Sequence, residues 1–161
     1  MKFKVVPVPP ESLDFVETAH RAVPLVAGSV DDCCARMMAK ANVPARDQAR
    51  EWLTFLQALG LAKEGDSGFS RVRKDYDTET LAAAFRERVF GADELIALLE
   101  DADGVLTPLE AFDRFEDTVP NWERHRHPET WEDIWAERVR RLLEWAVLLD
   151  LASWADGGYR A

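Results

Sequence analysis

The sequence predicts a mainly α-helical protein with small β-ribbons, built from two copies of one unit. Three observations predict this fold class. Helical patterns of apolar residues fill most of the 161 residues, and the last helix and ribbon of the first half recur in the second half. Each recurrence ends in a glycine-containing turn followed by an aromatic residue. A hydrophobic content of 47% is enough for packed cores and excludes global disorder.

The clearest part of the repeat aligns residues 46–70 with residues 136–160, an offset of 90 positions. The identical pairs are Arg50 and Arg140, Leu53 and Leu143, Leu59 and Leu149, Leu61 and Leu151, Ala62 and Ala152, Asp66 and Asp156, and Gly68 and Gly158. Similar pairs are Phe55 and Trp145, and Phe69 and Tyr159. Both segments therefore predict an amphipathic helix, a Leu-x-Leu-Ala exit and a ribbon that turns at glycine.

N-terminal to these segments, the two copies align with an offset of 78 positions instead of 90. This offset aligns two expected helix starts, residues 29–32 and residues 107–110. In each, a hydroxyl and a carboxylate three residues apart are typical of a capping box, which satisfies free N–H groups at a helix start. A short extended piece precedes each start. Before it we expect a further helix, over about residues 13–23 and 92–101.

Each copy thus has the order helix, short strand, helix, helix and two-stranded ribbon, which resembles the winged-helix family. The segment from Gly104 to Phe112 is similar to that family's usual entry into its second helix. The resemblance implies tandem winged-helix units at residues 1–75, with an extended N-terminal arm, and at residues 91–161, joined by a linker helix within 76–90. A plain helical bundle with fortuitous turns is the alternative, and the two matching glycine turns favour the winged helices.

The charge composition is unusual, because 15 Asp, 15 Glu and 15 Arg accompany only 5 Lys and 2 Ile, with a net charge of −10. This acid-rich, lysine-poor composition resembles proteins of salt-loving archaea. At molar salt the Debye length falls to about 3 Å, so the negative charge excludes a nucleic-acid partner less strongly than it would at low salt. Two adjacent cysteines exclude a disulfide framework. We expect a cytoplasmic protein without membrane contact, since neither a signal peptide nor a long apolar run is apparent.

The charge is unevenly distributed along the chain. Residues 1–75 carry 11 basic and 10 acidic side chains, whereas residues 76–161 carry 9 and 20. Chance together with a buried interface is one explanation, and an anionic partner of the N-terminal half is the other.

The third helix of the first copy offers candidate DNA contacts. Winged helices usually place the start of this helix in the major groove, and its expected outward face holds Arg46 and Arg50. The resemblance implies base contacts for these two arginines and phosphate contacts for Arg71 and Arg73 after the ribbon. A merely solvated face is the alternative.

The second copy points to a protein interface. Residues 142–149 are apolar on nearly every side, so we expect a second surface to cover them. The change of offset also places 12 extra residues near 119–130, before the third helix. The candidate partner or dimer contacts are Trp122, Trp131, Trp135, Trp145 and Leu148.

Metal and catalytic sites have weaker support. His125 and His127, with Glu123 or Glu129, form a possible metal set, but a solvated or packed loop is the default. The sulfur side chains at 33, 34, 37 and 38 suit a soft metal, and core packing explains them better. No nucleophile with a base and no phosphate-binding glycine loop is evident. We therefore expect no cofactor, no metal and no enzymatic activity.

The sequence favours a DNA-binding, transcription-regulator-like protein that acts through its N-terminal winged helix and pairs through its C-terminal one. The alternative is an adaptor that binds other proteins without DNA, as tandem winged helices do in the condensin-associated segregation proteins. A homodimer or another protein partner is expected in either case. No small-molecule substrate is evident.

Overall fold

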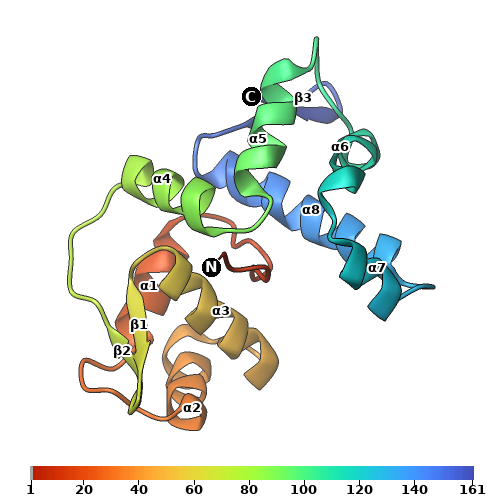
Figure 1. The fold of residues 1–161 in the computed structure, drawn as a ribbon. Coiled ribbons are helices and arrows are strands. Elements are labelled where there is room, and N and C mark those ends of the chain that lie inside the picture. Colours follow the sequence, from red (N-terminus) through yellow and green to blue (C-terminus); the bar gives the residue numbers. More distant parts are fainter. Residues whose placement is uncertain (1) are drawn as a thin grey trace. The chain divides into compact units, whose positions relative to one another are not determined.

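The computed structural model describes residues 2–161 and divides into two compact units, Met1–Val89 and Phe90–Ala161 (Figure 1). We refer to them as unit 1 and unit 2. Among the described residues, none of the helices is both long and apolar enough to cross a membrane.

Unit 1 contains four helices and one ribbon among its described residues. They are α1 (Asp14–Ala22), α2 (Val30–Ala41), α3 (Arg46–Ala58), β1 (Ala62–Gly65), β2 (Gly68–Arg71) and α4 (Thr78–Arg88). Helix α2 packs against α1 and α3. Aromatic rings extend the core on both sides of α3, since Trp52 lies 5.0 Å from Phe15 of α1 and Phe55 lies 6.5 Å from Phe85 of α4. The helix expected as a linker is therefore α4, and it packs within unit 1.

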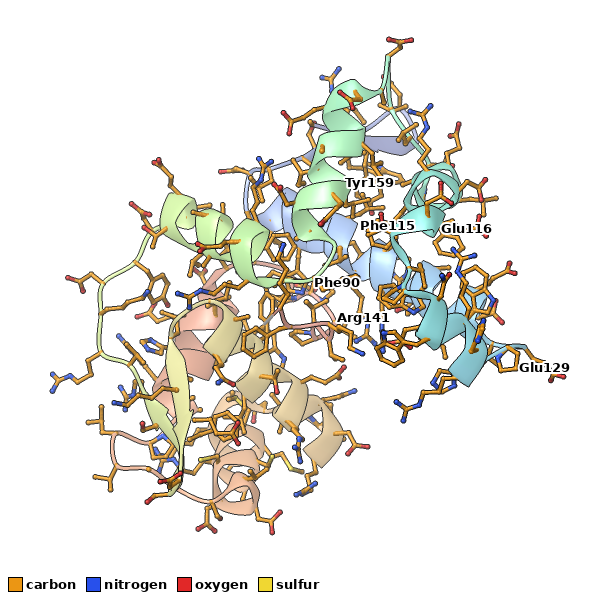
Figure 2. The ribbon with its side chains drawn as sticks, viewed as in Figure 1. Phe90, Phe115, Glu116, Glu129, Arg141 and Tyr159 are labelled. Carbon is orange, nitrogen blue, oxygen red and sulfur yellow. The ribbon has the colours of Figure 1, made fainter. Side chains whose placement is uncertain are left out.

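Unit 2 repeats this order with one addition. Its elements are α5 (Ala92–Asp101), α6 (Pro108–Phe115), the 3-10 turn η1 (Glu116–Thr118), α7 (Asn121–Arg126), α8 (Trp131–Leu148), β3 (Ser153–Ala155) and β4 (Gly158–Arg160). Helix α8 packs against both α5 and α6. The ring of Phe115, labelled in Figure 2, stacks on Trp135 at 6.2 Å and fixes α6 to α8.

The two ribbons have the same hydrogen-bonding register. The pairs of unit 1 are Lys63 with Ser70, Glu64 with Phe69, and Gly65 with Gly68. The pairs of unit 2, each 90 positions later, are Ser153 with Arg160, Trp154 with Tyr159, and Ala155 with Gly158. A single bridge joins each ribbon to the segment before the second helix, Gly28 to Phe69 and Leu106 to Tyr159. The structure thus confirms the predicted fold class of two tandem winged-helix units with small β-ribbons.

These bridges explain why glycine recurs at the start of the returning strand. A Cβ on Gly68 would lie 1.8 Å from the carbonyl oxygen of Gly28, and the φ of Gly68 is +110°. A Cβ on Gly158 would lie 2.8 Å from the carbonyl oxygen of Leu106. Both distances are too short for a side chain, so the close approach of the backbones requires glycine in each unit.

The helix starts follow the predicted capping pattern. The Ser29 hydroxyl accepts a hydrogen bond from the amide of Asp32 at 3.1 Å, at the start of α2. At the start of α6, Thr107 Oγ1 accepts from the amide of Glu110 at 3.2 Å, and the Glu110 carboxylate accepts from the amide of Thr107 at 3.0 Å. The reciprocal capping box is therefore formed at α6.

The extra residues of unit 2 are not a loop. They contain the short helix α7, which follows η1, and α8 begins at Trp131, five residues before the position equivalent to the start of α3. Arg124 holds α7 in place, because its guanidinium donates to the carbonyl oxygen of Glu116 and lies 4.3 Å from the centre of the Trp131 ring. The insert thus contains a helix that is joined to the start of α8 by the contact of Arg124 with Trp131.

The N-terminal arm, residues 2–13, extends beside α3 within unit 1. The amide of Phe3 donates to the carbonyl oxygen of Arg88 at 2.8 Å, and Phe3 forms a parallel bridge with Val89. Val6 is buried, with 2% of its surface exposed. The arm is therefore pinned to the end of α4 and anchored in the core of the unit.

Candidate nucleic-acid interface

The outward face of α3 has the residues expected from the sequence. Its buried side is the apolar stripe Ala49, Trp52, Leu53, Phe55 and Leu56. The opposite side carries Arg46, Asp47, Arg50, Glu51 and Thr54, and it holds both signs of charge. Helical periodicity places these polar side chains on one side, because residues three and four apart share a face.

Arg46 is engaged in an ion pair at the start of this face. Its guanidinium donates to the carboxylate of Asp31 in α2, and this hydrogen bond raises the pKa of Arg46 above its ordinary value. The side chains are 52% and 81% exposed, so water screens the attraction and the pair opens readily to a competing anion.

Arg50 lies one turn further along α3 and makes no ion pair with any residue of the described chain. Its charge and that of Arg46 act together on Cys34 of α2: burial raises the pKa of this thiol, and the two arginines oppose the increase. The equivalent residue of unit 2, Arg140, is held by Glu137 at 2.6 Å and by Glu144 at 2.9 Å. Among the described residues, Arg50 of unit 1 thus has no carboxylate partner, whereas the equivalent Arg140 of unit 2 has two.

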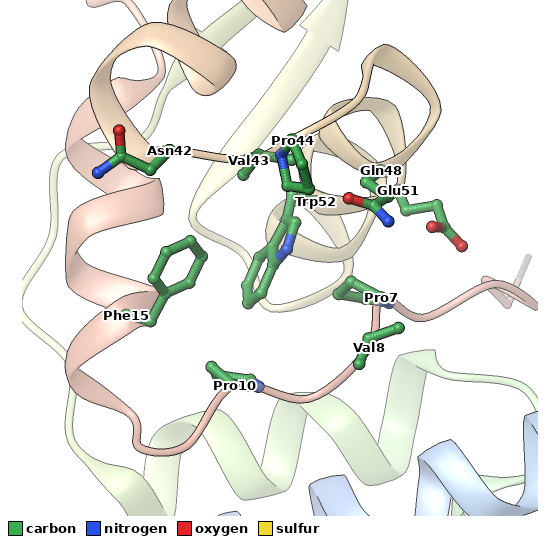
Figure 3. Close-up of a pocket in the computed structure, with 10 residues that line it drawn as sticks. All are labelled: Pro7, Val8, Pro10, Phe15, Asn42, Val43, Pro44, Gln48, Glu51 and Trp52. Carbon is green, nitrogen blue, oxygen red and sulfur yellow. The ribbon is translucent and has the colours of Figure 1, made fainter.

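The N-terminal arm borders this face of α3 on one side. Lys2 and Lys4 of the arm line a hollow of about 410 Å³ together with Arg50 and Thr54. A second hollow measures about 330 Å³. Its lining is drawn in Figure 3, where Pro7 and other arm residues face Phe15, Trp52 and the turn between α2 and α3. The sequence predicted an extended arm and gave no sign that it would lie along the third helix.

Arg71 and Arg73 lie in a different hollow from the α3 arginines. This hollow measures about 760 Å³ and is lined by Glu17, His20, Arg21, Arg71, Arg73, Lys74, Asp75 and Tyr76. The Arg71 guanidinium is half-buried and donates through Nε to the carbonyl oxygen of Val23 at 3.0 Å. The structure therefore brings Arg71 and Arg73 together, but it does not place them in one hollow with Arg46 and Arg50.

The tips of the two ribbons differ in chemistry. The turn of unit 1 carries Glu64 and Asp66 and adds no cation that would hold a phosphate. In unit 2 the position equivalent to Glu64 is Trp154, which is 54% exposed and lies 4.7 Å from the ring of Tyr159. The ribbon of unit 2 thus presents an apolar ring where that of unit 1 presents a carboxylate.

Two of the proposed interface aromatics are core residues, which corrects the sequence interpretation. Trp135 and Trp145 are 1% and 0% exposed. The apolar run of α8 is covered within the chain, because α5 and α6 pack on α8 from the same unit. Trp131 and Leu148 are half-buried, and Trp122 is 51% exposed. Of the five candidate contacts, Trp122, Trp131 and Leu148 therefore keep accessible surface in unit 2.

The sequence candidates for metal ligands do not form a site in the described residues. Among residues 2–161, no group of three or more His, Cys, Asp and Glu side chains is arranged to hold a metal ion. Cys33 instead donates weakly to the carbonyl oxygens of Gly28 and Phe69 at 3.5 and 3.7 Å, which fastens α2 to the ribbon. Burial raises the pKa of Cys33, so its thiol stays protonated.

Comparison with known proteins agrees with this architecture. A family model described as the halobacterial double winged helix domain matches residues 1–161. Neither the curated proteins nor the solved structures contain a match.

Proposed function

The chain belongs to the halobacterial double winged helix family, and from that premise we propose that it is a cytoplasmic, DNA-binding, transcription-regulator-like protein. The winged helix is a DNA-binding type of fold. In this proposal unit 1 contacts DNA, unit 2 binds a second copy or another protein, and the protein acts by binding and catalyses no reaction.

The observation that carries the proposal is the contrast between Arg50 and Arg140. The two residues occupy equivalent positions on the third helices, and only Arg140 is neutralised by carboxylates of its own helix. Because Arg50 has no carboxylate partner among the described residues, its charge is available to an external anion. The near-neutral charge of residues 1–75 supports the same unit.

In the proposed complex the start of α3 approaches the major groove. Arg50 would donate both guanidinium N–H groups to the acceptor edge of a guanine, which is the commonest specific contact of arginine. Arg46 would exchange Asp31 for a second base edge or a phosphate, because its present ion pair is solvent-exposed. Loss of one such contact costs about 1–3 kcal/mol, which is roughly a 5- to 150-fold loss of affinity.

The test is selection from random DNA duplexes in molar potassium chloride, followed by binding titrations of variants. Arg50→Ala should lose roughly 5- to 150-fold in affinity and relax the sequence preference. Arg140→Ala is the matched control, because it removes the same side chain from the equivalent helix of unit 2. The control should bind as the wild type does.

A selection that enriches no sequence, combined with no retention on bulk DNA, would overturn the proposal. Equal losses in Arg50→Ala and Arg140→Ala would instead place the contact outside the outward face of α3. Circular dichroism melts of both variants in the same salt show whether either change unfolds the protein.

A second candidate function is that of an adaptor that binds protein and no DNA. The exposed rings of Trp122 and Trp154 in unit 2 favour it, since large exposed aromatics mark protein interfaces. The adaptor proposal expects that Arg50→Ala has no effect. It also expects that Trp122→Ala abolishes either the self-association seen by light scattering or the capture of a defined partner.

A further inference from the structure

The hollow that contains Arg71 and Arg73 has a composition unlike the rest of the molecule. Four of the side chains that line it are cationic, namely Arg21, Arg71, Arg73 and Lys74, and two are anionic, Glu17 and Asp75. With His20 neutral, the hollow carries a net charge of +2, whereas the whole chain carries −10. The sequence has only 5 lysines, and one of them, Lys74, lines this hollow, so the hollow differs from the rest of the chain in residue type as well as in net charge.

One cation of this hollow, Arg71, is held in place by the fold, and a second, Lys74, lies beside the end of a helix. Arg71 is anchored through its Nε to the carbonyl oxygen of Val23, and its main-chain amide donates to Pro24 at 2.7 Å. A Cβ added to Gly60 would lie 2.9 Å from the Lys74 ammonium, which therefore sits at the C-terminal end of α3, where the helix dipole favours a cation. Because Arg71 is already ordered, it loses little entropy when it binds a ligand.

Aromatic rings form another wall of the hollow. His20 is 8% exposed, and its Nε2 donates to the carbonyl oxygen of Val72 at 2.8 Å. The ring of Tyr76 packs edge-on against His20 at 5.8 Å and is half-buried. The hollow thus combines a planar ring, which can stack on a base, with guanidinium groups, which bind phosphate by two parallel hydrogen bonds.

We propose that this hollow binds a small phosphorylated molecule, of which a nucleoside monophosphate has the best-matched chemistry. Arg71, Arg73 and Lys74 would hold the phosphate dianion, and Tyr76 would contact the base. The volume of about 760 Å³ lies within the range of about 300–1,000 Å³ that small-molecule sites occupy. The site is a further binding site, separate from the outward face of α3.

The separation from the proposed DNA contacts follows from the geometry. Lys74 lies at the C-terminal end of α3, while Arg46 and Arg50 lie in its first five residues. The side chains of α1 close the hollow on one side, and none of its lining residues lines the two hollows beside the arm. A phosphate bound here is therefore held by α1 and the segment after β2.

The experiment is a proton NMR titration of the full chain in molar potassium chloride, first with inorganic phosphate and then with 5′-AMP. The ring protons of His20 report on the hollow, and those of His125 and His127 in unit 2 are internal controls. We expect a saturable shift of the His20 signals alone, with a dissociation constant of about 1 mM or below for 5′-AMP and weaker binding of phosphate. The double variant Arg73→Gln with Lys74→Gln should weaken both ligands at least about tenfold.

Arg50→Ala is the matched control, because it removes a cation of unit 1 outside the hollow, and it should bind 5′-AMP as the wild type does. No saturable shift of the His20 signals, or an equal loss in the control, overturns the proposal. If the double variant binds duplex DNA more weakly and the wild type shows no response to 5′-AMP, the hollow holds the DNA backbone and the proposal is likewise overturned. Thermal melts of the variants separate lost binding from lost folding.

Discussion

Replacing Gly68 by alanine tests whether the ribbon of unit 1 is set by the close approach of two backbones. The new Cβ would lie 1.8 Å from the carbonyl oxygen of Gly28, and the φ of +110° is one that alanine rarely adopts. The strained backbone costs about 1–3 kcal/mol. The bridge between Gly28 and Phe69, with hydrogen bonds of 3.0 and 2.9 Å, would also break, at about 0.5–1.5 kcal/mol per bond.

Together these effects lower the free energy of unfolding of unit 1 by about 2–6 kcal/mol, a large part of the roughly 5–15 kcal/mol of a typical domain. The assays are thermal denaturation in molar potassium chloride and hydrogen exchange of the Phe69 amide. Gly65→Ala is the control, because its Cβ would meet nothing within 4 Å, and it should change stability by less than about 1 kcal/mol. A Gly68→Ala protein that melts with the wild type and keeps the Phe69 amide protected would refute the reasoning.

Three further predictions concern charge, pH and association. The net charge of −10 means that the acidic side chains repel one another when salt does not screen them, so the melting temperature should rise as potassium chloride increases to molar levels. A melting temperature that stays constant or falls with added salt would contradict this. Hydrogen bonds from Thr80, Thr107 and Arg140 depress the pKa values of Asp77, Glu110 and Glu137, respectively. The stability that these carboxylates contribute is therefore present above their unfolded pKa of about 4, and it should be lost as the pH falls through the depressed folded pKa values. Denaturation curves after pH jumps measure this loss, and a stability that is unchanged below pH 4 would contradict the prediction. Light scattering at high salt should show a dimer that Trp122→Ala dissociates, and a monomeric wild type would remove the proposed self-association through unit 2.

Local sequence patterns were sufficient to predict the repeat. The alternating Leu-x-Leu-Ala exits, the glycine turns and the aromatic residues each act over a few residues, and they fix the same ribbon register in both units. Capping residues likewise act within one helical turn, so Ser29 and Thr107 marked the starts of α2 and α6 correctly. Features determined by neighbouring residues were therefore accessible from one sequence.

Features that depend on distant contacts were not predicted. The hollow of unit 1 joins His20 to the segment after β2, and their hydrogen bond links positions 52 residues apart. The burial of Trp135 results from packing against Phe90 and Phe115, which the periodicity of α8 alone does not indicate. The sequence predicted a loop where the structure has helix α7. The contact of Arg124 with Trp131, which stabilises α7, forms only when the insert folds onto α8, so the sequence pattern did not indicate the helix.

The N-terminal arm imposes a conformational cost on any DNA complex that uses the major groove. A helix with its side chains is about 10–12 Å wide and the major groove is about 12 Å wide, so a duplex that takes Arg50 into the groove would displace the arm residues that share a hollow with it. Displacing the arm exposes Val6, which is 2% exposed in the folded unit, at a cost of about 1.5 kcal/mol or more. The competent conformer would then be a minority species of about one molecule in ten or fewer, and the apparent affinity would fall by the same factor. Association would therefore proceed by conformational selection, with an observed rate that reaches a plateau at high DNA concentration, where opening of the arm limits it.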